Sequence, residues 1–159
     1  LPVRDGAVDL ICALDVLEHL DDDAAALEDW SRALAPDGRL LLSVPALQLL
    51  WGRQDVLAEH RRRYSRKALA RRLRSAGFEL ERLSYFNTLL FPPVLALRLA
   101  MRPLLGRAAG QRSDLGLRLP GPIEEVLYRT FAAEAGWLVA RDLPIGVSLL
   151  AVARRGARA

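Results

Sequence analysis

The chain has 159 residues, of which 52% are hydrophobic and 26% are charged. This composition supplies enough apolar surface for one globular domain, and it excludes a disordered or low-complexity chain. The formal net charge of +4 is too small to indicate a nucleic-acid-binding protein by itself. Because the single cysteine, Cys12, cannot form a disulfide within the chain, we expect a cytoplasmic protein. No apolar run is long enough to predict a membrane-spanning helix.

Strand and helix patterns alternate in the first part of the chain. Residues 8–14 and 39–44 are short apolar runs, which predict two strands buried on both faces. Between them, Asp21 to Asp23 are candidate N-caps for a helix whose apolar positions recur from Leu27 to Leu34. Pro36-Asp37-Gly38 predicts the turn that ends this helix. A strand, a helix and a strand with short connections predict a parallel βαβ unit and an α/β fold.

A second helix and two further strands are predicted later in the chain. Ser65 is the expected N-cap of the helix, and Gly77 its expected C-terminal cap. Residues 78–86 begin by alternating apolar and charged side chains, which is typical of a half-exposed strand. Residues 146–153 predict the last strand.

The connection between these two strands covers residues 87–143. It contains an apolar stretch at 89–105, a glycine-rich loop and a predicted helix near 123–139. Connections this long usually carry function. Because Arg98 and Arg102 interrupt the apolar stretch, three interpretations stay open: peripheral membrane contact, a lid over an apolar substrate pocket, and packing in the core.

Several motifs follow one another in a specific order: DVLEHL at 15–20, LAPDGRLLLSVP at 34–45, and AGF at 76–78 after a basic helix. Together they resemble the second half of a class I S-adenosylmethionine-dependent methyltransferase of the small-molecule type, which includes quinone-biosynthesis enzymes. The resemblance covers about residues 1–86 and the last strand. It implies a partial Rossmann-like sheet, made of the later strands of seven, with a helical insertion before the last strand.

The resemblance also implies a cofactor, S-adenosylmethionine, and methyl transfer to a small-molecule or lipid-like acceptor. In open parallel sheets, ligands bind outside the carboxyl ends of the strands. The residues expected to line the cofactor are Ala13, Leu14 and Asp15. His19 and His60 are the catalytic candidates facing the acceptor, with His19 a candidate general base. Tyr64 is expected on the substrate side.

A metal site is an alternative function for the DVLEHL motif. Asp15, Glu18 and His19 have a DxxEH spacing, which resembles the ExxEH pattern of metal-binding small-RNA methyltransferases and some quinone methyltransferases. Carboxylates suit Mg²⁺, whereas imidazole suits transition metals. We expect no metal, because aspartate shortens the reach of the first position and further ligands are not recognisable. A metal-dependent RNA methyltransferase is kept only as an alternative function.

The family's glycine-rich cofactor loop and the acidic residue that ends its second strand have no counterpart in this sequence. Since the resemblance places both upstream of Leu1, we expect the carboxyl-terminal portion of an enzyme. A non-catalytic remnant or an interaction module is the alternative, and a free edge on the first strand would favour self-association. The expected parts are a methyltransferase core at 1–86, a helical insertion at 87–143, and the last strand with a basic tail at 144–159.

Eight basic side chains lie between residues 61 and 74. A phosphate-binding stripe and a solvated helix face are both compatible with such a run. No aromatic residues are interleaved in the manner of an RNA-binding motif. We therefore do not expect a nucleic-acid partner.

Overall fold

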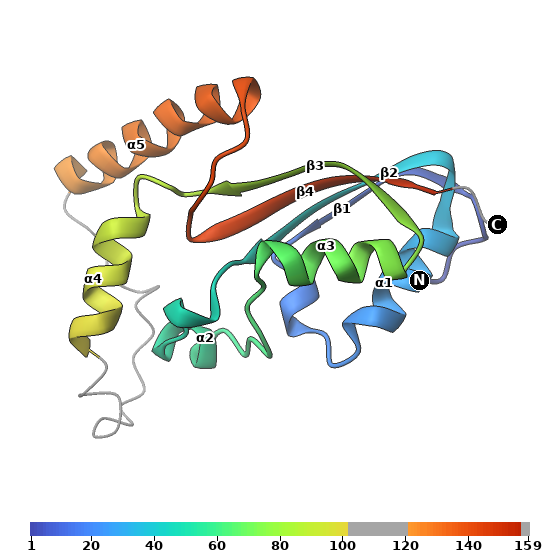
Figure 1. Ribbon diagram of the computed structural model, residues 1–159, viewed down its shortest axis with the longest axis horizontal. Helices are drawn as coiled ribbons and strands as arrows, with labels where there is room; N and C mark the ends of the chain where they lie inside the picture. Colours follow the sequence, from blue (N-terminus) through green and yellow to red (C-terminus); the bar gives the residue numbers. More distant parts are fainter. Residues whose placement is uncertain (102–120, 157–159) are drawn as a thin grey trace.

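The computed structural model describes residues 1–101 and 121–156, and its centre is a four-stranded sheet (Figure 1). The strands are β1 (Val8–Leu14), β2 (Leu34–Pro45), β3 (Phe78–Phe86) and β4 (Ser148–Arg155). Their order in the sheet is β1-β2-β4-β3. β1 and β2 run parallel, whereas β4 is antiparallel to both β2 and β3. The predicted α/β class is confirmed, and the last strand lies between the second and third.

Helices α1 (Asp23–Ala33) and α3 (Arg66–Ser75) lie along one face of the sheet (Figure 1). Their apolar sides pack on the sheet to form the core, where the side chains of Leu27, Leu40, Leu42, Val44, Leu69 and Leu73 are fully buried. Both predicted N-caps are confirmed, because Asp22 accepts a hydrogen bond from the backbone of Ala25 and Ser65 accepts one from that of Ala68. These caps fix where the covering helices begin.

Two strand boundaries differ from the prediction. β2 begins at Leu34 rather than at Arg39, because Leu34 already pairs with Val8 at the end of α1. The turn expected at residues 36–38 lies within β2, where the pairing with β1 shifts register and Asp37 has a φ of 64°. β4 spans 148–155 rather than 146–153, because it pairs with the length of β2 that ends at Pro45.

Three short elements lie beyond the carboxyl ends of the parallel strands, and the sequence patterns do not predict them. They are the 3₁₀ turns η1 (Leu17–His19) and η2 (Gln48–Leu50) and the helix α2 (Arg53–Leu57). Asp15 has a φ of 52°, a conformation that aspartate tolerates better than most residues, and it turns the chain from β1 into η1. The two parallel strands thus end next to a cluster of short turns.

Helices α4 (Phe91–Met101) and α5 (Gly121–Ala140) extend beyond one end of the sheet (Figure 1). Glu134 of α5 is buried and accepts hydrogen bonds from the backbones of Thr88 and Leu89, which join the two helices. α5 contains the predicted helix, whereas the glycine-rich loop and Leu105 lie outside the described residues. Among the described helices, none has both the length and the apolarity needed to span a membrane.

Candidate functional site

The carboxyl ends of β1 and β2 are joined by hydrogen bonds between Asp15 and Ser43. The Asp15 backbone N–H lies 3.1 Å from both the carbonyl oxygen and the Oγ of Ser43, and that Oγ donates to Asp15 Oδ1 at 3.0 Å. Of the three residues expected at the cofactor, Leu14 and Asp15 are exposed, whereas the side chain of Ala13 is buried in the core. The Asp15 carboxylate is thus held through Oδ1, and the residue stays exposed at the end of β1.

Glu18 follows in η1, and its carboxylate is completely buried. Neither side-chain oxygen of Glu18 has a hydrogen-bond partner within the described part of the chain. Burial, together with the nearby negative charge of Asp15, raises the pKa of Glu18 to about 7. A buried and unpartnered carboxylate is costly to a fold, so this group requires an explanation beyond packing.

The two catalytic candidates, His19 and His60, meet beside Glu18. Their rings contact edge to face, with centroids 4.8 Å apart. The backbone N–H of Arg61 donates to the carbonyl of Glu18 at 2.8 Å and fixes the His60 segment against η1. His60 Nε2 lies 3.9 Å from Glu18 Oε1. The structure therefore brings together two residues that are distant in the sequence.

Asp55 orients His60 from behind. Its buried Oδ1 lies 2.9 Å from His60 Nδ1 and accepts a hydrogen bond from Arg63 Nε at 2.7 Å, while its Oδ2 accepts one from the Gly52 backbone. Burial acts to raise the pKa of Asp55, but the hydrogen bonds from Arg63 and His60 outweigh it and lower that pKa below its usual range. Because an ionised carboxylate can only accept a hydrogen bond, the tautomer of His60 that pairs with Asp55 carries its proton on Nδ1 and its lone pair on Nε2.

Sequence reasoning missed Asp55, although two signals were present. It is an acidic residue five positions before His60, and Arg63 lies three positions after that histidine. The loop between β2 and α3 has no periodic pattern, so nothing in the sequence alone placed these three charged groups together. Their arrangement depends on side-chain hydrogen bonds within this loop.

A hollow of about 550 Å³ opens beside His60. Trp51, Val56, Glu59, His60 and Arg61 line it. Its wall combines two apolar side chains, Trp51 and Val56, with three polar ones, and small-molecule sites likewise combine apolar contacts with a few polar groups. This hollow is the candidate acceptor pocket.

Tyr64, the residue expected on the substrate side, is not among the residues that line this hollow. It is buried, and its hydroxyl donates to Asp23 Oδ2 at 2.9 Å. Burial raises the pKa of the Tyr64 phenol, and the Asp23 carboxylate adds to the effect. In this position the tyrosine links α1 to the loop before α3.

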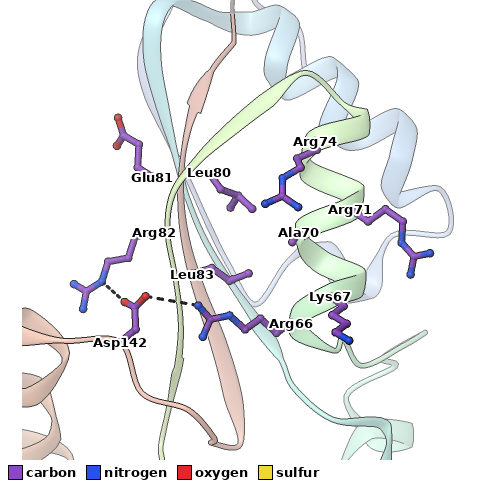
Figure 2. Close-up of a pocket in the computed structure, with 10 residues that line it drawn as sticks. All are labelled: Arg66, Lys67, Ala70, Arg71, Arg74, Leu80, Glu81, Arg82, Leu83 and Asp142. Carbon is purple, nitrogen blue, oxygen red and sulfur yellow. Dashed lines mark hydrogen bonds and ion pairs between the residues drawn. The ribbon is translucent and has the colours of Figure 1, made fainter.

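Most of the eight basic residues between 61 and 74 are paired with acidic residues in the fold. Five of its eight members form ion pairs with aspartates: Arg61, Arg62, Arg63, Arg66 and Arg72. A separate hollow of about 830 Å³ lies between α3 and β3, and Figure 2 shows Asp142 on its wall, paired with both Arg66 and Arg82. Ion pairs thus neutralise much of the run.

The strand order and the turn at the ends of β1 and β2 define a Rossmann-like fold of the methyltransferase class. Residues 2–83 match the family model described as "Methyltransferase domain". The chain belongs to this family, whose members use S-adenosylmethionine as cofactor. Membership confirms the family resemblance drawn from the DVLEHL and LAPDGRLLLSVP motifs.

One curated relative is the "Probable S-adenosylmethionine-dependent methyltransferase" of Mycolicibacterium smegmatis, which is 36% identical over 83 residues. The match covers 51% of this chain and 32% of the relative, so the chain spans about a third of that protein's length.

Solved structures agree on the fold. A methyltransferase from Mesorhizobium loti aligns with a TM-score of 0.52 at 18% identity, over 98% of this chain and 65% of its own. The [4+2]-cyclase SpnF aligns with a TM-score of 0.55 at 21% identity, over 99% of this chain and 53% of its own. A phosphoethanolamine N-methyltransferase of Haemonchus contortus, in complex with S-adenosylmethionine, aligns with a TM-score of 0.51 at 10% identity, over 98% of this chain and 35% of its own. Since one of these proteins is a cyclase by name, the fold alone does not determine the reaction.

Proposed function

We propose that this chain forms the carboxyl-terminal part of an enzyme that transfers a methyl group from S-adenosylmethionine to a small-molecule or lipid-like acceptor. The observation that carries the proposal is the exposed turn at Leu14 and Asp15, which lies at the carboxyl end of β1 and one short turn from the paired histidines. Family membership supports the cofactor.

The described residues fit one part of the cofactor. Asp15 Oδ1 is held by Ser43, and its other carboxylate oxygen is available to a positively charged amino group such as that of the methionyl portion. The exposed side chain of Leu14 offers an apolar contact beside it. When bound, S-adenosylmethionine supplies an activated methyl group.

The acceptor side is proposed to be the hollow beside His60. His60 lines this hollow and contacts His19 edge to face, and the two rings are proposed to orient an acceptor toward the turn at Asp15. Orientation of two reacting atoms supplies a large part of the catalysis when the acceptor is already a good nucleophile. The exposed apolar side chains of α4 and α5, including Leu97 and Val126, support a lipid-like acceptor.

The remainder of the cofactor site is proposed to lie on a preceding segment that packs against the open face and free edge of β1. Leu10, Cys12 and Leu14 are exposed on that face. An uncovered apolar strand edge is a site for pairing, and the nucleotide end of the cofactor needs contacts that these residues do not offer. Self-association through the same edge is the competing arrangement.

The test is calorimetric titration with S-adenosylhomocysteine. The 159-residue chain is compared with the same chain extended upstream by the sequence that precedes it in its gene. We expect only the extended form to bind. In that form, Asp15→Ala should weaken binding about ten- to a hundredfold, because a hydrogen bond to a charged group contributes about 1.5–3 kcal/mol.

Asp9→Ala is the matched control, because Asp9 is an exposed aspartate on the same strand. It should leave the affinity unchanged. Binding by the 159-residue chain alone would show that the cofactor site is complete without a further segment. Binding by neither form would favour an interaction module over an enzyme.

A further inference from the structure

Both histidines of the chain converge on one buried carboxylate. One ligand atom each from Glu18, His19 and His60 lie within 4.8 Å of one another. The three residues come from two segments, η1 and the loop after α2, which the hydrogen bond from Arg61 to Glu18 holds together. The cluster is therefore a feature of the folded chain and not of one local sequence motif.

The Glu18 carboxylate lacks, among the described residues, the hydrogen-bond donors that a buried carboxylate normally has. Its exposed fraction is 0%, and both of its oxygens are without hydrogen-bond partners in the described ranges. Native proteins almost always satisfy such groups with a donor, a water or a cation. His60 Nε2 is 3.9 Å from Glu18 Oε1, which is beyond hydrogen-bond distance.

His60 has the surroundings of a metal-binding histidine. Its Nδ1 is held at 2.9 Å by the ionised Asp55, which is itself fixed by Arg63 and the Gly52 backbone. A carboxylate behind a histidine fixes the ring orientation and makes the other nitrogen a stronger ligand, as in many metal sites. That other nitrogen, Nε2, faces Glu18.

We propose that Glu18, His19 and His60 bind a divalent transition metal ion, with Zn²⁺ as the representative. Two imidazoles and one carboxylate suit Zn²⁺ and its transition-metal neighbours better than Mg²⁺, which prefers oxygen ligands. The three donor atoms are farther from one another than they would be around a bound ion. Because metal–ligand distances are about 2.0–2.2 Å, binding would draw the three side chains inward. Asp15, the first position of the DxxEH spacing, is not a member because Ser43 holds it.

Three protein ligands leave a coordination position open. His60 is also part of the wall of the 550 Å³ hollow, so the open position is available to an oxygen or nitrogen atom of a molecule in that hollow. This inference does not rest on methyl transfer, because it concerns only the binding of an ion by three side chains.

The test is titration of the chelator-treated 159-residue chain with Zn²⁺, followed by calorimetry and by the histidine ring proton signals in NMR spectra. With only two histidines in the chain, exactly two sets of signals are expected, and both should shift at one equivalent of Zn²⁺. Co²⁺ should give a visible absorption band with the same stoichiometry.

Glu18→Gln keeps the shape of the side chain but removes its charge, and it should lower the affinity for Zn²⁺ at least about tenfold. Asp55→Asn, behind His60, should lower the affinity about ten- to a hundredfold. Glu28→Gln is the matched control, because Glu28 is an exposed glutamate on α1, and it should change nothing. Circular dichroism of each metal-free variant separates lost ligation from lost folding.

The proposal is overturned if the wild-type chain shows no saturable binding. It is also overturned if Glu18→Gln binds as tightly as wild type while both histidine signals stay unshifted. In that case the ion binds elsewhere on the chain. The result is independent of the S-adenosylhomocysteine titration, so either proposal can fail alone.

Discussion

The two faces of the sheet are built from similar residues but differ in what covers them. On the face beneath α1 and α3, Leu40 and Leu42 are fully buried. On the opposite face, Leu10 is 57% exposed and Leu14 is 54% exposed. Because neighbouring residues of a strand point to opposite faces, an apolar run such as 8–14 predicts a sheet covered on both sides. The comparison shows that the described residues supply one of the two layers the strands require.

The largest expected difference between the two faces is in the free energy of unfolding. Leu42→Ala removes a fully buried side chain and should destabilise the 159-residue chain by about 2–5 kcal/mol. Leu10→Ala, the matched change on the open face, should cost less than about 0.5 kcal/mol. Urea denaturation measures both. Equal losses would mean that the open face is already covered, for example by a second copy of the chain.

The second largest expected effect is on the rate at which a thiol on the open face is chemically modified. Cys12 is the only cysteine and is exposed on β1, so a thiol reagent should modify the 159-residue chain rapidly. In the chain extended upstream, the added segment should slow this reaction about tenfold or more, because modification would then require a local opening. Labelling of each form in denaturant gives the rate for an uncovered thiol. An unchanged rate in the extended form would leave β1 uncovered and contradict the proposed packing.

Much of the covered layer could be predicted from the sequence, because local patterns determine it. The apolar run at 8–14 and the alternating run at 78–86 correspond to β1 and β3 at both ends, and the caps at Asp22 and Ser65 fix the helices. The start of β2 was wrong by five residues, since Leu34 joins the sheet through a pairing with Val8 that no local signal contains.

The site was predicted less completely, for a related reason. His19 and His60 were selected singly from a family resemblance, but their contact depends on the loop between β2 and α3, which the backbone hydrogen bond from Arg61 to Glu18 holds against η1. Asp55 and Glu18 are buried charges, which composition and periodicity predict to be on the surface. The partners of Asp55 are close in sequence but lie in a loop without a periodic pattern, and Glu18 approaches His60 only in the folded chain.

The smallest effect expected concerns Tyr64, which is buried and does not line the hollow beside His60. Its buried hydroxyl donates to Asp23, a carboxylate that also pairs with Arg62 at 3.2 Å. Tyr64→Phe should therefore destabilise the chain by about 1 kcal/mol, the net contribution of a typical hydrogen bond. Tyr128→Phe is the control, because Tyr128 is 69% exposed on α5, and its effect should be near zero.

Binding separates the two roles of Tyr64. If its hydroxyl serves packing alone, Tyr64→Phe leaves the affinities for Zn²⁺ and S-adenosylhomocysteine unchanged while the midpoint of urea denaturation falls. If it touches the acceptor, methyl transfer by the extended enzyme falls while the midpoint stays the same. The first outcome is expected, because Asp23 lies between α1 and α3 and a hydroxyl committed to it at 2.9 Å has no donor hydrogen left for a substrate.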